Sequence, residues 1–335
     1  MKAALYYGAD KGLVIGEKDK PTPGENDVLV RIKCASLCHS DLRIIDGQQA
    51  PPTVPIVPGH EATGYVDDVG SNVTDVSTGD AVGMFLYYGF CGSCSACDAT
   101  PMACPQGSIQ GFTADGYFAE YAVVDRRSIV KLPAGMDVVS AAPIFCAGLT
   151  AFHAVSKCNL KKGDYIGIVG VGGIGHLALQ YAAKMGLKPI AIDTDNSRLA
   201  HAGELGAVGI VNATDPDFRE KVHEITKGGA AATCVCSAAL QAYASAVQTL
   251  KPGGLLMVVG LPEGSLPIPA LPIAMGLLRV QGASSGRPDE MEACISFSHQ
   301  HNIVPRVEQH NLEDLPELVE RMHKGQFDGR MVVVF

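Results

Sequence analysis

A glycine-rich turn between an apolar strand and an amphipathic helix constrains the fold of this chain more than any other feature. The apolar run 165–169 leads directly into the segment GVGGIG, and a helical pattern follows it. In such a turn the first glycine permits a tight bend, the second lets the backbone approach a pyrophosphate, and the third allows close packing of helix on strand. The positive end of the helix dipole then faces the phosphates. The sequence therefore predicts a dinucleotide site at Gly170, Gly172, Gly173, Ile174 and Gly175.

The region after about residue 163 alternates strand-like apolar runs with amphipathic stretches of helical length. This alternation is typical of a parallel sheet covered by helices, and six strands suffice for a doubly wound nucleotide-binding sheet. The expected strands are 165–169, 189–193, 209–212, 233–237, 255–259 and 278–282. The expected helices are 174–185, 197–204, 216–226 and 240–250.

An acidic residue, Asp193, ends the second expected strand, about twenty residues after the glycine-rich turn. A carboxylate at this position accepts hydrogen bonds from the adenosine ribose hydroxyls and repels a 2′-phosphate. The sequence therefore favours NAD over NADP. Arg198 follows closely enough in the sequence to keep binding of NADP open.

The first 150 residues have a different character, with many glycines and prolines between short β-branched runs. Such short strands between turns predict an irregular β-rich domain, with strands at 28–32, 62–69, 81–84 and 118–124. We expect residues 284–335, with a helix near 315–324 and a strand at 330–335, to complete this domain, and residues 151–283 to form the nucleotide-binding domain. A chain of 335 residues is long enough for two domains of ~150 residues each.

The composition excludes several classes of partner. Hydrophobic residues make up 47% of the chain and charged residues 18%, which suits a large buried core. The formal net charge of −9 leaves no basic surface for nucleic acid. The longest apolar runs fall far short of the ~20 residues of a membrane span, and the N-terminus lacks the apolar segment of a signal peptide. We expect a cytoplasmic protein with neither a nucleic-acid nor a membrane partner.

Four of the eleven cysteines lie close together, at Cys91, Cys94, Cys97 and Cys104. Four thiolates on one short loop suit a tetrahedral structural zinc that leaves no position open for chemistry. Disulfide pairing is the alternative, and a reducing cytosol disfavours it. The sequence predicts that this loop holds zinc and takes no part in catalysis.

A second possible ligand set is dispersed along the chain, at Cys38, His60 with its neighbour Glu61, and Cys146. A single cysteine or histidine is more often a structural residue than a metal ligand. Two cysteines and one histidine around an open fourth position are nevertheless a known catalytic zinc arrangement. The spacing alone does not assemble this second site.

With these motifs in their order, the chain resembles the zinc-dependent alcohol dehydrogenases of the medium-chain dehydrogenase/reductase superfamily over nearly its whole length. It is most similar to the yeast-type and bacterial propanol-preferring members, and more distantly similar to cinnamyl alcohol dehydrogenases. The resemblance implies an α/β fold with a GroES-like β-rich catalytic domain and a Rossmann domain, two zinc ions per chain, NAD, and a homo-oligomer, either a dimer or a tetramer. The motifs are CHSDL (38–42), GHE (59–61), DGYFAEY (115–121), CAGLT (146–150), GVGGIGH (170–176), VVGLP (258–262) and GR (329–330).

The resemblance also implies roles for individual residues. Ser40 would bond the substrate hydroxyl and begin a proton relay, Asp41 would support the ligand His60, and Glu61 would be a nearby or alternating ligand. Catalytic zinc would act as a Lewis acid on the alcohol oxygen, and hydride would pass to the nicotinamide. The catalytic zinc ligands would be Cys38, His60 and Cys146, and further cofactor contacts would come from His39, Arg330, Thr150, Val259 and Leu261.

Three departures from the family pattern accompany the resemblance. The last gap of the cysteine loop is one residue shorter than usual, and Arg43 stands where many relatives have the histidine that ends the relay. An arginine cannot accept that proton, so we expect the proton to leave through water or a ribose hydroxyl. The chain has no tryptophan, and Ile45 and Leu86 replace two that narrow the pocket of yeast-type enzymes. We therefore expect bulky, secondary or aromatic substrates.

Other functions remain open at the level of sequence. A zinc polyol dehydrogenase usually has an acidic residue where this chain has Cys146, and a zinc-free quinone or enoyl reductase would lack the dispersed ligand set. An NADP-dependent cinnamyl-type aldehyde reductase would share the ligands and differ in its cofactor. A non-enzymatic NAD-binding relative would have no need of Ser40 and the zinc ligands, and activity with any alcohol would exclude it.

Overall fold

The computed structural model describes residues 1–283 and 286–335. Contacts between residues divide this part of the chain into two units. The β unit is Met1–Cys146 with Arg287–Phe335, and the sheet unit is Ala147–Gly286. The expected return of the chain to the first domain at residue 284 falls on Ser284 and Ser285, which lie outside the described residues.

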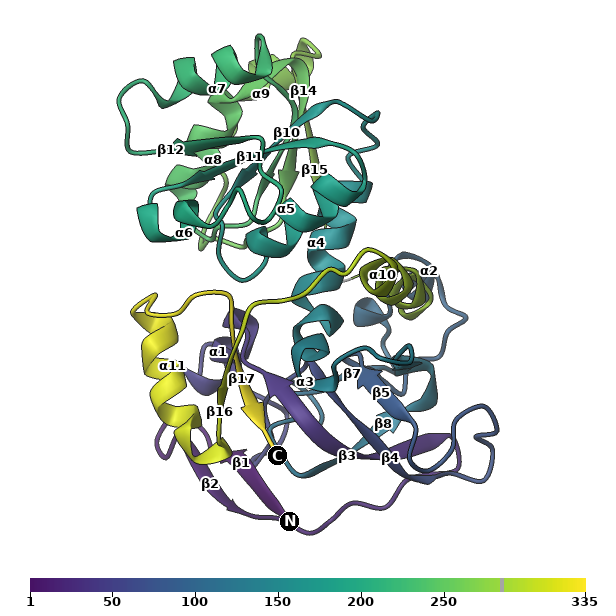
Figure 1. Ribbon diagram of the computed structural model, residues 1–335. Helices are drawn as coiled ribbons and strands as arrows, with labels where there is room; N and C mark the ends of the chain where they lie inside the picture. The colour runs from purple at the N-terminus through teal and green to yellow at the C-terminus, as the bar shows by residue number, and fades with distance from the viewer. Residues whose placement is uncertain (284–285) are drawn as a thin grey trace. The chain divides into compact units, whose positions relative to one another are not determined.

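The sheet unit contains a six-stranded parallel sheet with helices on both faces (Figure 1). Its strand order is β12-β11-β10-β13-β14-β15, so the order reverses between β10 and β13. Ligands of doubly wound sheets bind at the carboxyl ends of the strands beside such a reversal. The strands are β10 (Tyr165–Val169), β11 (Lys188–Asp193), β12 (Gly209–Asn212), β13 (Ala230–Val235), β14 (Leu250–Val258) and β15 (Leu278–Gly282). The helices are α4 (Ala147–Ser156), α5 (Gly175–Lys184), α6 (Asn196–Ala200), α7 (Phe218–Thr226), α8 (Leu240–Gln248) and α9 (Ala270–Ala274).

The central strands of this sheet form because their residues are apolar on both faces. All residues of β13 are buried, as are the last four of β10. Continuous apolar runs of this kind are typical of parallel strands covered on both sides. One face packs against α7 and α8 in a core that contains Val169, Ile192, Val222, Tyr243 and Leu256.

The expected ends of two strands are wrong. The expected strand 255–259 is the second half of β14, which begins at Leu250, so α8 ends at Gln248 rather than at 250. The early start is made possible by an irregularity: Gly253 has φ +74°, and the pairing of β13 with β14 shifts register between Ala230 and Ala232. The expected strand 233–237 is correspondingly β13, which ends two residues earlier. The short helix α9 was not expected.

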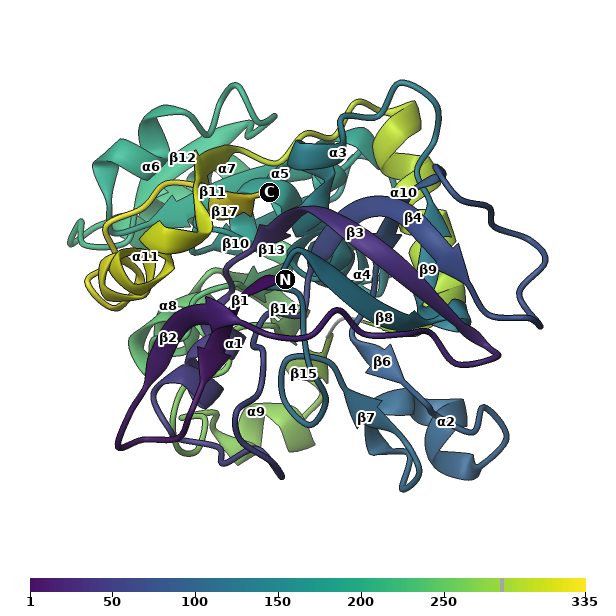
Figure 2. The same cartoon turned by 90° about the horizontal axis from the view of Figure 1, so that it is seen from below.

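The β unit is built on a seven-stranded sheet in which β3 is the longest strand (Figure 2). The path is β16-β17-β3-β4-β5-β9, and β8 also pairs with β3. Two small pairs, β1–β2 and β6–β7, lie outside this sheet. The strands are β1 (Lys2–Tyr6), β2 (Leu13–Glu17), β3 (Asp27–Ser36), β4 (Ala62–Val69), β5 (Ala81–Met84), β6 (Tyr87–Tyr88), β7 (Ser108–Ile109), β8 (Tyr121–Asp125), β9 (Ile129–Lys131), β16 (Val307–His310) and β17 (Arg330–Val334).

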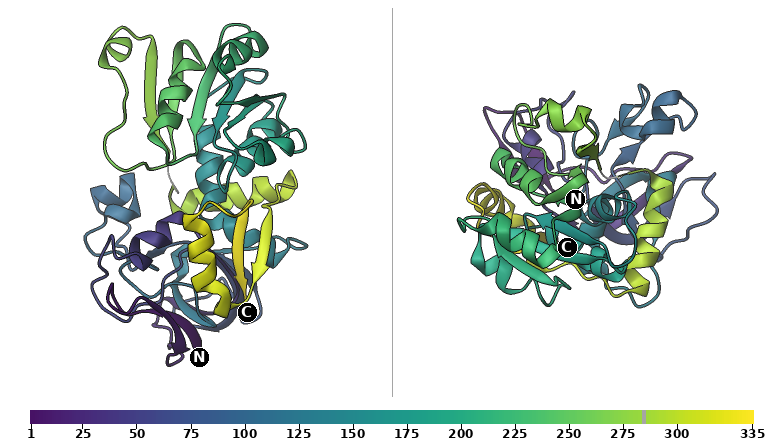
Figure 3. Two further views of the ribbon diagram at one scale, coloured as in Figure 1. Left: turned by 90° about the vertical axis from the view of Figure 1, so that its left-hand side faces the viewer. Right: turned by 90° about the horizontal axis from the view of Figure 1, so that it is seen from above.

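The C-terminal segment supplies the edge of this sheet. Strand β17 pairs antiparallel with β3, with Val332 opposite Ser36, and β16 pairs parallel with β17. Helix α11 (Leu315–His323) lies beside these strands, at the yellow end of the chain (Figures 1 and 3). Its apolar face joins the main core of the unit together with Met331 and Val333.

One expectation for the β unit is wrong in detail, and one helix of the unit was not expected. The expected strand 118–124 is β8, which begins at Tyr121, because the carbonyl of Phe118 accepts from Ala4 of β1 instead. Helix α10 (Pro288–Gln300) was not expected. Its start is nevertheless marked in the sequence, since Pro288 is in the first turn and Glu290 accepts from the amide of Arg287 at 2.8 Å.

Shorter helical segments complete the β unit. They are α1 (His39–Ile45), α2 (Ser95–Ala99) and α3 (Val138–Ala141), with 3₁₀ turns at Pro101–Ala103, Arg126–Ser128, Ala142–Phe145 and Leu312–Asp314. Over residues 1–283 and 286–335, no single helix has both the length and the apolar character needed to cross a membrane.

Candidate functional site

The dispersed ligand set converges in the β unit. Cys38 is the residue before α1, His60 precedes β4, and Cys146 follows the 3₁₀ turn Ala142–Phe145. Their ligand atoms all lie within 4.8 Å of one another, and His60 Nε2 is 3.2 Å from Cys146 Sγ. Cys38 and His60 are buried and Cys146 is half-buried. Two sulfurs and one imidazole nitrogen fit a zinc ion and leave its fourth position for substrate.

One buried carboxylate orients two of these ligands. Asp41 Oδ1 lies 2.6 Å from His60 Nδ1, and Asp41 Oδ2 accepts from the amide of Cys38 at 2.9 Å. Asp41 is completely buried, so water does not compete for these bonds. A hydrogen bond at Nδ1 leaves Nε2 of the imidazole for a metal.

The three ligand groups shift one another's pKa values. The pKa of Cys38 lies well below that of an ordinary thiol, chiefly because the Cys146 thiol donates to its sulfur. The pKa of Cys146 is correspondingly well above the usual value, because its proton is held by that bond and because it is buried. Burial is the largest single influence on His60 and opposes its protonation, but the charge and hydrogen bond of Asp41 and those of Cys38 together outweigh burial and raise the pKa of His60 to about 10. The ligands thus hold charge that a divalent cation would compensate.

Glu61 does not join the three ligands in this structure. Its carboxylate forms an ion pair with the guanidinium of Arg330, and both side chains are almost completely buried. Arg330 Nε also donates to Ser36 Oγ at 3.3 Å. The pair places a positive charge beside the ligand set, and that charge contributes to the low pKa of Cys38.

Three further expected residues lie on two elements, α1 of the β unit and α4 of the sheet unit. His39 and Ser40 are in the first turn of α1, where His39 is exposed and its ring centroid lies 5.8 Å from that of Phe327. Ser40 is half-buried. Thr150 is buried on α4, in the sheet unit.

Phe112 is a neighbour of this site that sequence reasoning did not find. Its ring centroid lies 5.4 Å from that of His60, and it packs with Tyr6, Ile44 and Ile56 in a small buried cluster. No motif or spacing marks Phe112, because its contact with His60 depends on how the loop 110–118 returns to the segment before β4.

The four expected cysteines of the loop also converge. Their sulfurs lie within 4.8 Å of one another, around α2 and the 3₁₀ turn that follows it. The amide of Cys91 donates to the sulfur of Cys104 at 3.4 Å. A backbone hydrogen bond from Ser93 is the main cause that lowers the pKa of Cys91 to about 6. Four thiol groups in this arrangement fit a closed structural zinc, despite the shortened last gap.

A cation supports the cysteine loop from outside. Arg127 packs over the ring of Phe90 at 3.9 Å and forms an ion pair with Asp125 at 2.6 Å. Asp125 in turn accepts from the amide of Gly89, just before the loop, at 3.1 Å. Asp125 raises the pKa of Arg127, and the thiolates of Cys97 and Cys91 raise it further.

The glycine-rich turn of the sheet unit connects β10 to α5. Gly170 has φ +88°, which favours glycine, and a Cβ at position 175 would overlap the carbonyl of Gly170. A Cβ at position 172 would meet nothing closer than Arg198 Nη1 at 4.0 Å. The turn is thus packed where the helix leaves it and open at Gly172, as a pyrophosphate site requires. Gly173 and Ile174, between these positions, are half-buried.

Asp193 is held at the end of β11 by three backbone amides. Its carboxylate accepts from Val171 of the glycine-rich turn at 2.6 Å, from Thr194 at 2.7 Å and from Asp195 at 3.0 Å. Arg198 lies on α6, 3.8 Å from the carboxylate of Asp195. Asp193 therefore links the strand end to the glycine-rich turn.

Val259 and Leu261 follow β14 at the carboxyl edge of the same sheet. Val259 is buried, whereas Leu261 is 74% exposed. A Cβ on Gly260 between them would overlap the carbonyl of Ser237. The turn therefore packs closely on the segment that follows β13.

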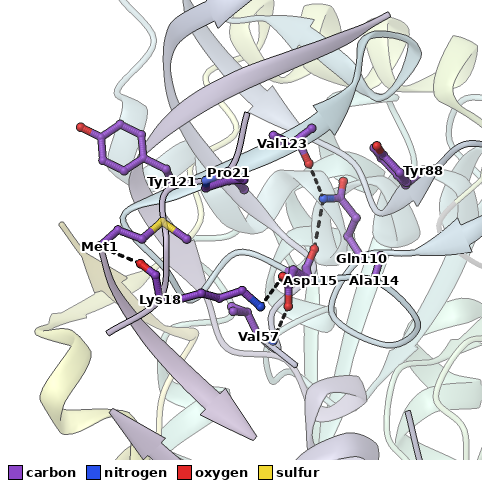
Figure 4. A pocket seen from close by; sticks show the side chains of 12 residues that line it. Met1, Lys18, Pro21, Val57, Tyr88, Gln110, Ala114, Asp115, Tyr121 and Val123 are labelled. Carbon is purple, nitrogen blue, oxygen red and sulfur yellow. Dashed lines mark hydrogen bonds and ion pairs between the residues drawn. The ribbon is translucent and has the colours of Figure 1, made fainter. Parts of the chain in front are cut away.

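A separate cavity of about 190 Å³ lies in the β unit near Met1 (Figure 4). Lys18 and Asp115 in its wall form an ion pair at 2.6 Å, and Gln110 Nε2 donates to the carbonyl of Val123 at 2.9 Å. These polar groups are satisfied by one another, so nothing here points to a ligand.

Comparisons with known proteins agree with this geometry. Residues 24–134 match the family model for the alcohol dehydrogenase GroES-like domain, and residues 173–300 match that for zinc-binding dehydrogenases. An alcohol dehydrogenase of Geobacillus stearothermophilus is 36% identical over 99% of this chain and 98% of its own.

Solved structures extend the comparison. The alcohol dehydrogenase of the archaeon Aeropyrum pernix superimposes with a TM-score of 0.91 at 32% identity over the whole of both chains. A cinnamyl alcohol dehydrogenase of Sorghum bicolor gives a TM-score of 0.89 at 26% identity, over 99% of this chain and 97% of its own.

Proposed function

This chain belongs to the zinc-binding alcohol dehydrogenase family, and from that premise we propose that it oxidises alcohols with NAD and reduces aldehydes or ketones with NADH. Members of this family are alcohol or aldehyde oxidoreductases that use zinc and a nicotinamide dinucleotide. The observation that carries the proposal for this chain is the convergence of Cys38, His60 and Cys146 within 4.8 Å.

Each polar residue of the site has a proposed task. Bound zinc would supply a Lewis acid to the alcohol oxygen, and bound NAD would supply the hydride acceptor. Ser40 accepts the proton of the substrate hydroxyl, and Asp41 keeps His60 in the tautomer that presents Nε2 to the metal. Arg43 is exposed on α1 and its guanidinium has no acceptor atom for a proton, so the proton leaves Ser40 through water or a ribose hydroxyl.

The first experiment measures zinc and activity together. Protein purified without added metal should contain about two zinc ions per chain and should oxidise alcohols with NAD. Removal of zinc by a chelator should abolish the reaction, and added zinc should restore it. Two zinc ions without activity on any alcohol, aldehyde or ketone would favour a non-enzymatic dinucleotide-binding protein.

We propose NAD rather than NADP as the cofactor because Asp193 is fixed by three amides at the end of β11. A 2′-phosphate there would meet its carboxylate. Asp193→Ala should therefore raise kcat/KM for NADP relative to NAD by about tenfold or more. Arg198→Gln is the variant to compare with Asp193→Ala, because Arg198 is the other residue of this part of the sheet unit that bears on the choice between NAD and NADP. A wild-type enzyme that prefers NADP would instead indicate a cinnamyl-type aldehyde reductase that uses Arg198 for the phosphate.

We propose bulky, secondary or aromatic substrates because Ile45 and Leu86 replace two tryptophans of yeast-type relatives. The chain has no tryptophan, so no indole ring narrows any pocket it forms. The test compares kcat/KM for benzyl alcohol, 2-butanol and ethanol. A higher value for ethanol than for the other two would reject this substrate class.

We propose a homo-oligomer, with β15 paired across a two-fold axis. This strand is an edge of the sheet, and the residues around it expose apolar side chains: Leu271 is 72% exposed, Met275 66%, Leu277 53% and Val280 39%. Unpaired apolar edges favour association. Light scattering should give the molar mass of a dimer or a tetramer. Val280→Lys should lower that molar mass, because it places a charge on the strand that we propose to pair across the axis.

A cytoplasmic location is proposed from the cysteines. No disulfide joins any of the eleven cysteines, all of which lie in residues that the structure describes. Eleven reduced cysteines, with two sets arranged for zinc, suit a reducing compartment. Fractionation of the native cells, with detection of this chain, tests the location.

A further inference from the structure

A buried tyrosine lies behind the turn at the carboxyl end of β14. Tyr243, on α8, is completely buried, and its hydroxyl donates to the carbonyl of Gly260. Burial raises the pKa of Tyr243 to about 12, although a backbone hydrogen bond with Val259 lowers it. The hydroxyl is therefore a neutral group that contacts two successive residues of the turn.

The turn has little freedom in other directions. The amide of Gly260 donates to the carbonyl of Val235 at the end of β13, at 2.8 Å, and a Cβ at position 260 would overlap the carbonyl of Ser237. Ser237 also approaches the glycine-rich turn, since a Cβ at Gly170 would lie 3.0 Å from its amide nitrogen. The carboxyl ends of β10, β13 and β14 are therefore packed against one another, and Tyr243 fixes the last of them from within.

The position of this turn relates it to one half of the cofactor. The strand order reverses between β10 and β13, and a dinucleotide crosses such a sheet at the reversal. Asp193, the expected ribose ligand, is on β11, on one side of the reversal. The nicotinamide half then extends over β13 and β14, where Val259–Leu261 lies.

We propose that Tyr243 is a positioning residue for the nicotinamide half of the cofactor, acting through the Val259–Leu261 turn. The inference rests on the proposed dinucleotide binding at this edge. The Tyr243 ring fills the core that it shares with Val235 and Leu256, and phenylalanine would fill the same space. What phenylalanine lacks is the donor to Gly260, so the buried carbonyl would lose that bond and the turn would reorient.

The test uses Tyr243→Phe in the zinc-loaded full-length enzyme, with two probes. NADH contains the nicotinamide, whereas ADP-ribose shares the rest of the molecule and lacks that ring. We expect the Kd for NADH to rise about tenfold and the Kd for ADP-ribose to change less than about twofold. The fluorescence emission of bound NADH should shift toward that of free NADH, because the ring is held less firmly.

Two controls make the result specific. Tyr165→Phe removes a hydroxyl at the start of β10, at the amino edge of the same sheet, and should leave both dissociation constants unchanged. Thermal unfolding of each variant reports on general loss of stability. Equal weakening of NADH and ADP-ribose by Tyr243→Phe, or no weakening of either, would overturn the proposal. Failure of the wild-type enzyme to bind either probe would instead reject the proposed dinucleotide binding.

Discussion

The two cysteine-containing sites of the β unit are built in opposite ways. Cys91, Cys94, Cys97 and Cys104 lie on one loop, so a short stretch of chain supplies all four sulfurs. Cys38, His60 and Cys146 come from three separate places in the β unit and meet only because β3, β4 and the turn before Cys146 are packed together. The first site depends on local chain geometry, whereas the second depends on the whole unit.

Their surroundings differ in the same sense. The loop sulfurs accept backbone hydrogen bonds and have a half-exposed cation, Arg127, nearby. The dispersed ligands are oriented by the buried carboxylate of Asp41 and lie beside the buried Glu61–Arg330 pair. A closed site with four protein ligands suits a structural role. A site whose ligands are oriented by buried polar groups, with one coordination position open, suits catalysis.

The largest effect should follow loss of a dispersed ligand. His60→Ala should lower kcat/KM at least about 10³-fold, because the zinc that would act as Lewis acid loses one of its three protein ligands. The zinc content should fall from about two to about one ion per chain. Metal analysis and steady-state kinetics on the same preparation measure both. A variant that kept both ions and most of its activity would remove the catalytic assignment of this site.

Loss of a loop ligand should have the opposite profile. Cys94→Ser should also lower the zinc content by about one ion per chain, yet kcat/KM at 25 °C should stay within about threefold of wild type, because the loop has no task in the reaction. The midpoint of thermal inactivation should fall by about 10 °C, since zinc binding stabilises the folded loop. If activity fell as steeply as in His60→Ala, the division into structural and catalytic sites would be wrong.

A smaller effect is expected at Asp41. Asp41→Asn keeps an oxygen that accepts from Cys38 but loses the charge that faces His60. Zinc affinity of the dispersed site should fall about 10–100-fold, and that of the cysteine loop should not change. Competition with a chromogenic chelator resolves the two ions. Equal weakening of both ions would show that the substitution disturbs the fold instead of one ligand.

The smallest effect is expected beside the loop. Arg127→Met removes the cation near the thiolates and should speed zinc release about threefold, a modest change because the guanidinium is half exposed. Arg126→Met is the matched control, since the neighbouring Arg126 pairs with Asp75 instead. Release rates that are the same for both variants would show that Arg127 does not stabilise the metal-bound loop.

The same contrast explains what the sequence could predict. The glycine-rich turn and the alternating strands and helices predicted the doubly wound sheet, and the fold class is confirmed. Both are periodic or local patterns. The ends of β13 and β14 were wrong because a register shift next to Gly253 cannot be read from hydrophobic periodicity.

The residues that reasoning from sequence did not find act across the fold. The zinc site of the cysteine loop could be predicted from the spacing of its four cysteines. The dispersed ligand set could be predicted only from the resemblance of the chain to a family. Phe112 against His60, and Tyr243 beneath Gly260, are contacts between segments that no motif connects. An apolar or aromatic residue in a sequence indicates burial but not its neighbours. The roles of Ser40, Glu61 and Arg330 stay predictions.

The discontinuous build of the β unit has a consequence for synthesis of the chain. About 140 residues separate Cys146 from Arg287, where the second part of the unit begins. At roughly 5–20 residues per second, a ribosome needs roughly 7–30 s to cross that interval. During this time β3 has no β17 beside it and Glu61 has no Arg330, while the cysteine loop is already complete. The nascent chain therefore acquires the four loop cysteines well before Arg330 can pair with Glu61 beside the dispersed ligands, and the sheet unit is translated in between.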